Sequence, residues 1–245
     1  LVPYGTTGGL DTVAVRMPSH PVVRAVIKAA GTPIAAPSAN TSGRPSPTKA
    51  SHVVEDMDGK VDMIVDGGEV GIGLESTIID VSEDTPTILR PGYITKEMLE
   101  QVIGGVALDR ASLGQMAPGV HPKAPGMKYR HYAPKAELTI YRGRVPAAAR
   151  AINEALRTAA AEGKRAGVIC TEESAGLYEA PVKKIIGTRT QPETIAHNLY
   201  DVLRAFDEEA VDCIFSESFD DSPLSGAIMN RLTKAAGHRI IECRE

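Results

Sequence analysis

Small polar side chains gather between Ala36 and Thr48, directly after the apolar residues 33–36. The hydroxyl and amide side chains of this stretch are Ser38, Asn40, Thr41, Ser42, Ser46 and Thr48. Such groups bind phosphate oxygens, and a glycine such as Gly43 lets backbone N–H groups approach an anion closely. The plain alternative is a polar surface loop with a helix cap, and the loop by itself favours neither interpretation.

Three further positions could add to a binding site. Ser76 opens an apolar run after a glycine-rich turn, and Arg90 closes the next apolar run, where its planar fork of donors suits a phosphate or carboxylate. Thr12 and Arg16 are four residues apart on an expected strand, so they share a face and could hold the carboxylate of a zwitterion. An ordinary turn, a surface ion pair and a polar outer face are the respective alternatives.

The sequence shows no recognisable catalytic triad and no metal-ligand spacing. Glu75 and Asp80 could do acid–base work, although nothing singles them out. We therefore assign neither a catalytic residue nor a metal ligand. The pattern predicts chemistry by positioning of anions and polar substrates.

Residues 1–110 alternate between expected strands and helices, which indicates an α/β domain. We expect strands at 11–18, 32–37, 61–68, 76–84 and 85–92, and helices at 19–31, 46–60 and 95–104. Ser46 is the expected cap of the second helix. The tight turn near Asp84 predicts an antiparallel pair, so the sheet should be mixed.

The second half of the chain repeats a strand–helix rhythm. Residues 111–136 are rich in Pro and Gly and read as a linker, after which residues 137–245 predict a parallel, Rossmann-like domain. The first strand of that domain is followed by a single glycine, Gly143, so we expect no dinucleotide site.

Composition narrows the classes of protein. Residues 1–118 hold nine Lys and Arg against fourteen Asp and Glu, whereas residues 119–136 hold four basic residues and no acidic one. This distribution argues against a general nucleic-acid surface. No apolar run reaches the ~18 residues of a membrane helix. The three cysteines, Cys170, Cys213 and Cys243, are widely spaced, so we expect free thiols and a cytoplasmic location.

Taken together, several motifs resemble one family. The stretches GLDTVAVRMP, APSANTSGRPSPT, GLESTIID and LRPG match the second half of a YrdC-like domain. PGMKYRHYAPK, followed by a Rossmann-like region, resembles the linker and C-terminal domain of the long, two-domain form of the threonylcarbamoyl-AMP synthases. The resemblance covers essentially the whole chain, with Ala124 in place of the usual serine before Pro125.

The resemblance implies a reaction in which L-threonine, bicarbonate and ATP, accompanied by Mg²⁺, give threonylcarbamoyl-AMP and pyrophosphate. The product would pass to downstream machinery that modifies tRNA to N6-threonylcarbamoyladenosine, and direct tRNA binding is left open. The residues that the resemblance assigns to L-threonine are Thr12, Arg16, Ala36 and Ser76. Those that it assigns to ATP are Ser38, Asn40, Ser46, Arg90 and the linker residue Tyr132.

One departure and three alternatives accompany this reading. The family carries an N-terminal half with a Lys-x-Arg motif that these residues do not include, so we expect the 245 residues alone to be a poor or inactive enzyme. The alternatives are an RNA-binding module, which the acidic first part opposes, a YrdC-like carbamoyl transferase, which the Rossmann-like half opposes, and an inactive interaction domain.

Overall fold

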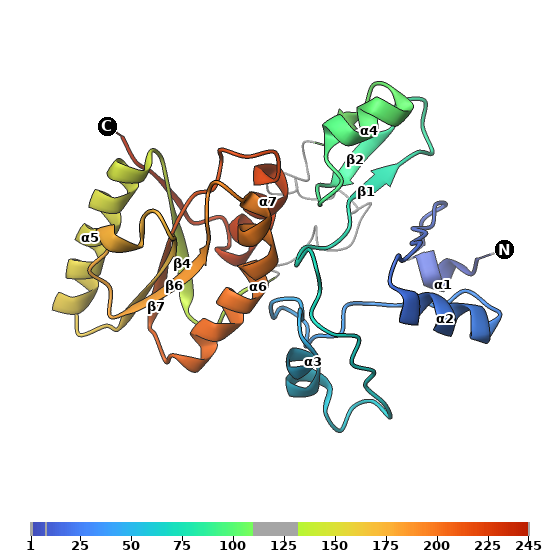
Figure 1. The fold of residues 1–245 in the computed structure, drawn as a ribbon, viewed down its shortest axis with the longest axis horizontal. Helices are drawn as coiled ribbons and strands as arrows, with labels where there is room; N and C mark the ends of the chain where they lie inside the picture. The colour runs from blue at the N-terminus through green and yellow to red at the C-terminus, as the bar shows by residue number, and fades with distance from the viewer. Residues whose placement is uncertain (1, 8, 110–131, 245) are drawn as a thin grey trace.

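The computed structural model describes residues 2–7, 9–109 and 132–244. Figure 1 shows their helices and strands along the chain. In order, these are α1 (Tyr4–Thr7), α2 (Pro21–Ala30), α3 (Ala50–Met57), β1 (Ile78–Asp80), β2 (Thr87–Arg90), α4 (Lys96–Ile103), β3 (Ala107–Leu108), β4 (Glu137–Arg142), α5 (Val145–Ala161), β5 (Ala166–Thr171), the 3-10 turn η2 (Ala175–Leu177), β6 (Val182–Gly187), α6 (Pro192–Glu208), β7 (Cys213–Glu217), α7 (Ser225–Ala235) and β8 (Ile240–Glu242).

The C-terminal part is built on a sheet with the strand order β6-β5-β7-β4-β8, and all of its strand pairs are parallel. Helix α5 covers one face, and α6 with α7 covers the other (Figure 1). Both faces are therefore apolar: Leu138 and Ile169 join the core under α6 and α7, whereas Val168 and Cys170 join the core under α5. The predicted parallel, Rossmann-like domain is confirmed.

A small second sheet has the order β1-β2-β3. β1 and β2 pair antiparallel, and β2 and β3 pair parallel, as the predicted mixed sheet requires. Helix α4 follows β2, and the side chain of Thr95 caps it by accepting a hydrogen bond from the N–H of Met98.

The strands predicted at 11–18, 32–37 and 61–68 do not form. Val13, Val15 and Met17 alternate as a strand would, yet their exposed fractions are 44%, 86% and 93%. A strand needs a neighbouring strand to satisfy its backbone N–H and C=O groups, and the described residues place none beside these stretches. The strand predictions for these stretches were wrong, because pairing is a tertiary property that local pattern does not supply.

Helix α3 also begins later than predicted, at Ala50 with Lys49 before it. Ser46 does not cap it, because the Ser46 hydroxyl is engaged elsewhere, as described below. Helix α2 follows the expected pattern, with Pro21 in its first turn and Gly31 in the left-handed conformation after its end.

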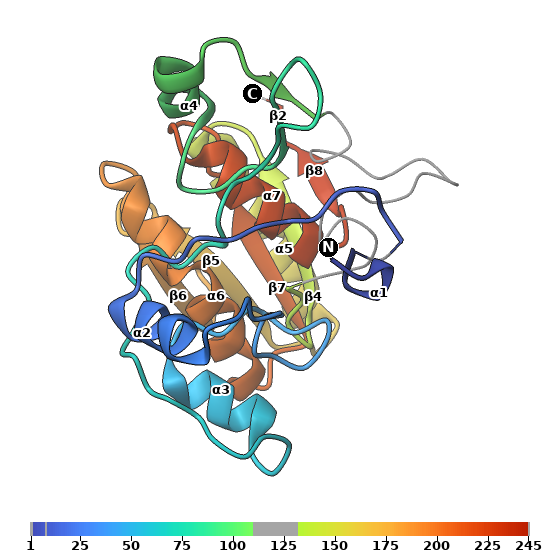
Figure 2. The same cartoon turned by 90° about the vertical axis from the view of Figure 1, so that its right-hand side faces the viewer.

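Residues 2–109 lie on the side of the C-terminal sheet that carries α6 and α7, away from α5 (Figures 1 and 2). Residues 111–131 of the predicted linker fall outside the described residues, so the predicted domain boundaries stay predictions. Among the described helices, none is long and apolar enough to cross a membrane.

Candidate functional site

Glu75 joins the two parts of the chain. Its Oε1 accepts a hydrogen bond of 2.6 Å from Ser46 Oγ, and Tyr200 Oη lies 2.9 and 2.7 Å from its two carboxylate oxygens. Its Oε2 also accepts a bond of 3.0 Å from Arg231 Nε. Tyr200 lies on α6 and Arg231 on α7, so one carboxylate links the polar loop to two helices of the C-terminal domain.

Glu75 has the properties of a structural anchor, an ionised carboxylate held by hydrogen bonds, rather than those of a catalytic base. Burial alone would raise its pKa, but the charge of Arg231 and the hydrogen bonds from Ser46 and Tyr200 hold the pKa below its usual value. The carboxylate is thus ionised and both oxygens have donors, which leaves it unsuited to take a proton from a substrate. Asp80, the other acidic candidate, accepts hydrogen bonds from Ser82 in a local turn.

Arg90 lies beside this anchor, at the end of β2. Its side chain is 6% exposed, and its Nε and Nη2 donate to the carbonyl oxygen of Ser76 at 3.1 and 2.9 Å. The chain turns sharply after it, because a Cβ at Gly92 would overlap the backbone of Glu75 to Thr77. β2 and the residues before β1 are thereby held in close contact.

Arg90, Arg231 and Lys234 place three positive charges near one another. Burial and the nearby Arg231 lower the pKa of Arg90. Burial, Arg231 and Arg90 together lower the pKa of Lys234 to about 8, and Glu75 is the opposing attraction. Within the described residues, the side chain of Lys234 makes no hydrogen bond or ion pair. Three cationic side chains therefore surround a single carboxylate, an arrangement that favours an incoming anion.

Tyr132 brings the end of the linker to the same place. Its ring is 6% exposed and lies 5.1 Å from the ring of Tyr200, centroid to centroid. Its φ of 65° is in the left-handed region, which is uncommon for a non-glycine residue and concentrates at functional positions. The N–H of Ala133 donates to the carbonyl oxygen of Gly43 at 3.0 Å, so the linker end touches the polar loop.

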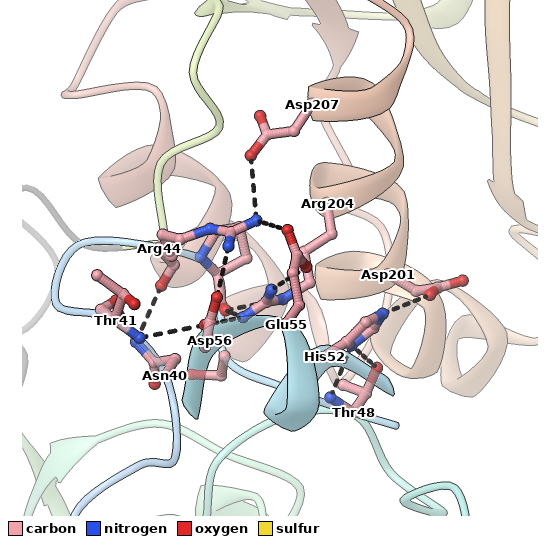
Figure 3. A network of polar contacts seen from close by, with 12 residues as sticks. Asn40, Thr41, Arg44, Thr48, His52, Glu55, Asp56, Asp201, Arg204 and Asp207 are labelled. Atoms are coloured by element: carbon pink, nitrogen blue, oxygen red, sulfur yellow. Dashed lines mark hydrogen bonds and ion pairs between the residues drawn. The ribbon is translucent and has the colours of Figure 1, made fainter. Parts of the chain in front are cut away.

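Asp56 on α3 fixes the polar loop through hydrogen bonds to Thr41 and Arg44 (Figure 3). Its carboxylate accepts hydrogen bonds from the N–H of Thr41 at 3.1 Å, from Arg44, and from Arg204 at 2.7 Å. Asn40 adds bonds to the carbonyls of Thr41 and Arg44, at 2.9 and 3.3 Å. Burial raises the pKa of Asp56, but the bond from Arg204 and these other donors keep it below the usual value. The loop is thus anchored through its backbone, with Arg204 supplied by α6.

The structure gathers some of the predicted site residues and leaves others apart. Ser46, Ser76, Arg90 and Tyr132 all adjoin the Glu75 anchor, through the contacts given above. Thr12, Arg16, Ala36 and Ser38 are exposed and, within the described residues, make no side-chain hydrogen bond or ion pair. Asn40, the ninth predicted residue, bonds within the polar loop, and the assignment of all nine residues to L-threonine and ATP stays a prediction.

Sequence reasoning missed the polar face of α6. That face consists of His197, Tyr200, Asp201, Arg204 and Asp207, and each of them contacts residues outside the C-terminal sheet. Their spacing of three and four residues along an otherwise apolar helix was the available signal.

Comparison with known proteins places the chain in a family. Residues 94–237 match the family described as "Threonylcarbamoyl-AMP synthase, C-terminal domain", and residues 2–92 match the family described as "Telomere recombination". A curated threonylcarbamoyl-AMP synthase of Pyrococcus abyssi is 47% identical over 99% of this chain and 69% of its own length. The chain belongs to the threonylcarbamoyl-AMP synthase family.

Two further relatives of this family bear on the structure. The threonylcarbamoyl-AMP synthase of Bacillus subtilis is 52% identical over 96% of this chain and 66% of its own length. A crystal structure of P. abyssi Sua5 complexed with L-threonine aligns with a TM-score of 0.89 at 46% identity, covering 99% of this chain and 69% of that one. The chain thus spans about two thirds of the length of these family members, and the mixed sheet, the parallel sheet and their arrangement are those of the family's two-domain fold.

Proposed function

We propose that the protein forms threonylcarbamoyl-AMP and pyrophosphate from L-threonine, bicarbonate and ATP. The observation that carries the proposal is the convergence of Ser46, Ser76, Arg90 and Tyr132 on one interface in a chain of the threonylcarbamoyl-AMP synthase family. Two bond changes are required. The threonine nitrogen joins the bicarbonate carbon with loss of water, and a carbamate oxygen then attacks the α-phosphorus, releasing pyrophosphate as the bond between the α- and β-phosphates breaks.

The described residues suit a reaction that needs positioning more than covalent catalysis. The polar loop, with Ser38, Asn40 and Ser46, is proposed to bind the nucleotide, and Arg90 to neutralise its phosphates. Thr12, Arg16, Ala36 and Ser76 are proposed to bind L-threonine and its carbamoyl group. Holding the carbamate and the α-phosphate in line would supply most of the acceleration.

Mg²⁺ is proposed to enter with ATP. It keeps several waters and usually binds through substrate phosphates with one or two protein oxygens, and it needs no dedicated cage. That donor set fits this interface, because the Ser46 hydroxyl keeps oxygen lone pairs while it donates to Glu75. No ligand is required from the Glu75 carboxylate, which already accepts from Ser46, Tyr200 and Arg231. When bound, the ion would neutralise phosphate charge.

The linker is proposed to act as a strap over the nucleotide. Residues 119–136 carry four basic and no acidic side chains, and Tyr132 and Ala133 at their end contact Tyr200 and the polar loop. A cover that excludes water would protect a carbamate from hydrolysis. A solved variant of P. abyssi Sua5 replaces a histidine and the following tyrosine by alanine, and this chain contains His-Tyr once, at His131 and Tyr132. Deleting residues 121–136 should abolish turnover in a chain that stays folded, and full activity would contradict the strap.

The product is a mixed anhydride, which transfers its acyl group readily. We propose that it passes, in the cytoplasm, to the machinery that makes N6-threonylcarbamoyladenosine in tRNA. We also propose that the 245 residues alone turn over more slowly than the B. subtilis relative. The support for this is the exposed apolar series Val13, Val15 and Met17, which leaves Thr12 and Arg16 without a packed neighbourhood to fix them.

The test is pyrophosphate release with ATP, bicarbonate and single amino acids in turn, using the B. subtilis relative as the positive control. Equilibrium binding of ATP and L-threonine is measured in the same samples, so that slow turnover is separated from absent binding. Release that requires both L-threonine and bicarbonate supports the proposal, as does its loss in Arg90→Met but not in Arg157→Met, a change at an exposed position of α5. Release without threonine, or salt-sensitive RNA binding with neither turnover nor ATP binding, would contradict it.

A further inference from the structure

We propose that Arg204 of α6 is a positioning residue for the polar loop at 40–46. Through Arg204, the C-terminal domain fixes the conformation of the loop that is proposed to bind the nucleotide. The inference rests on the proposed function, because it concerns the same loop. It assigns the C-terminal domain a role that its lack of a glycine-rich dinucleotide turn leaves open.

Arg204 grips the backbone of the loop directly. Its Nε and Nη2 donate to the carbonyl oxygen of Pro45 at 3.1 and 2.7 Å, next to Ser46. The side chain is 4% exposed, so these bonds form in a largely dry interface. A fork of two donors on one carbonyl fixes both the position and the orientation of that peptide group.

The same guanidinium holds the other end of the loop through Asp56. Arg204 Nη2 lies 2.7 Å from Asp56 Oδ2, the oxygen that accepts the N–H of Thr41. Arg44 pairs with the second oxygen of Asp56, and Arg204 Nη1 lies 3.2 Å from Glu55. Figure 3 shows Asp56 between Arg204 on one side and Thr41 and Asn40 on the other, with Arg44 next to it. One buried side chain thus ties both ends of the turn.

The neighbouring turns of α6 act on the same surface. Tyr200, four residues before Arg204, reaches Glu75, which in turn holds Ser46. Asp207, three residues after it, lies 3.6 Å from Arg44 and also accepts the N–H of Lys135 at 2.8 Å, near the end of the linker. Helix α6 also lies close to the backbone at Gly73, because a Cβ at Gly73 would overlap the carbonyl oxygen of His197. The loop, the segment at Glu75 and Ser76, and the linker end therefore all contact the same helix.

This arrangement predicts that loss of Arg204 loosens the loop before it unfolds the chain. The C-terminal core of α6 is formed by residues such as Leu199 and Leu203, on the other face of the helix, and Arg204→Met leaves that face intact. A looser loop should weaken ATP binding by requiring order to be restored on binding, with little effect on the chemical step.

Hydrogen exchange followed by mass spectrometry, on the full chain, tests this. In Arg204→Met, amides in peptides covering 38–48 should exchange about tenfold faster, while peptides from β5 and β7 are unchanged. The matched control is Arg157→Met on the exposed side of α5, which should change neither set. Arg204→Lys keeps the charge beside Asp56 but loses the fork, so it should lie between the two. Unchanged exchange at 38–48 would overturn the proposal, and so would an equal rise in the loop and in the strands, which would indicate a purely structural role.

Kinetics supply the second readout. The KM for ATP should rise about tenfold in Arg204→Met with kcat within about twofold, because uniform binding rather than transition-state binding is lost. A fall in kcat with unchanged KM would contradict the positioning role. If the unmodified chain bound no ATP while the loop still loosened in Arg204→Met, the contact would stand and the proposed function would fall.

Discussion

Replacing Arg231 by methionine should remove a buried ion pair between the two parts of the chain. The Arg231 side chain is fully buried, and it donates to the Glu75 carboxylate at 3.0 Å, to the carbonyl oxygen of Glu75 at 3.1 Å, and to the carbonyl oxygen of Pro91. The variant leaves Glu75 as a partly buried carboxylate without its ion-pair partner, with Arg90 and Lys234 as the remaining nearby cations. Removing one partner of a buried ion pair destabilises by about 3–5 kcal/mol.

The lower end of that range applies here. Glu75 keeps the hydrogen bonds from Ser46 and Tyr200, and its side chain is 18% exposed, so part of its charge stays solvated. We expect about 3 kcal/mol for Arg231→Met, and somewhat less for Glu75→Gln, which keeps the shape of the side chain. In the double variant neither charge is left unpaired, so its cost should fall about 2 kcal/mol short of the sum of the two single changes.

Urea denaturation of the full chain and the three variants measures this cycle. With a slope of about 2–3 kcal/mol per molar urea, Arg231→Met should lower the midpoint by about 1–1.5 M. The pKa of Glu75 is lowered in the folded chain, so the pair contributes stability above the ordinary glutamate pKa and loses it as pH falls through the folded value. A single-variant loss below about 0.5 kcal/mol, or a double variant equal to the sum, would refute the assignment of the pair as an anchor.

Three other predictions follow from particular residues. Lys234→Met should stabilise the chain by about 1–3 kcal/mol at pH 7, because folding lowers the pKa of Lys234 to about 8 and so disfavours its charged form. The gain should shrink between about pH 8 and 10.5, which chemical denaturation across that range measures. A gain that does not change with pH would contradict this prediction. Gly73→Ala should destabilise the chain by at least about 1 kcal/mol, because the new Cβ meets the backbone of His197. Gly59→Ala is the control: it is also at positive φ but in open space, so it measures the backbone strain without the clash. Equal losses in thermal unfolding would contradict the close contact with α6. Tyr132→Phe keeps the ring contact with Tyr200 but removes the hydrogen bond of the hydroxyl to Tyr200, so it should cost about 1 kcal/mol in urea. Tyr132→Ala should cost about 3 kcal/mol, and equal losses would show that the hydroxyl rather than the ring carries the contact.

The two sheets differ in how far local pattern could predict them. In the parallel sheet, runs such as 166–171 are apolar on both faces, so their strands were predictable from β-rich composition and the helices between them. Near Val13 the alternation of apolar and polar residues was clear, but no strand forms there. The difference lies in strand pairing. A run that is apolar on both faces indicates a central strand by itself, whereas a run that is apolar on one face forms a strand only if another strand pairs with it, which the sequence pattern does not reveal.

The sequence by itself determined the residue types of the site and their attachment to loops, and its motifs identified the family, because the hydroxyls, amides and arginines that hold anions recur in short, recognisable stretches. Only the tertiary structure decided which of them meet. Ser46 was expected to cap a helix, but in the structure it donates a hydrogen bond to Glu75. Glu75 was a candidate base, but it is an ionised carboxylate that links the two parts of the chain. The second outcome depends on Tyr200 and Arg231, which lie more than a hundred residues from Glu75 along the chain. Contacts over such separations depend on how whole helices pack, and a helix face that is polar in sequence shows its partner only after folding.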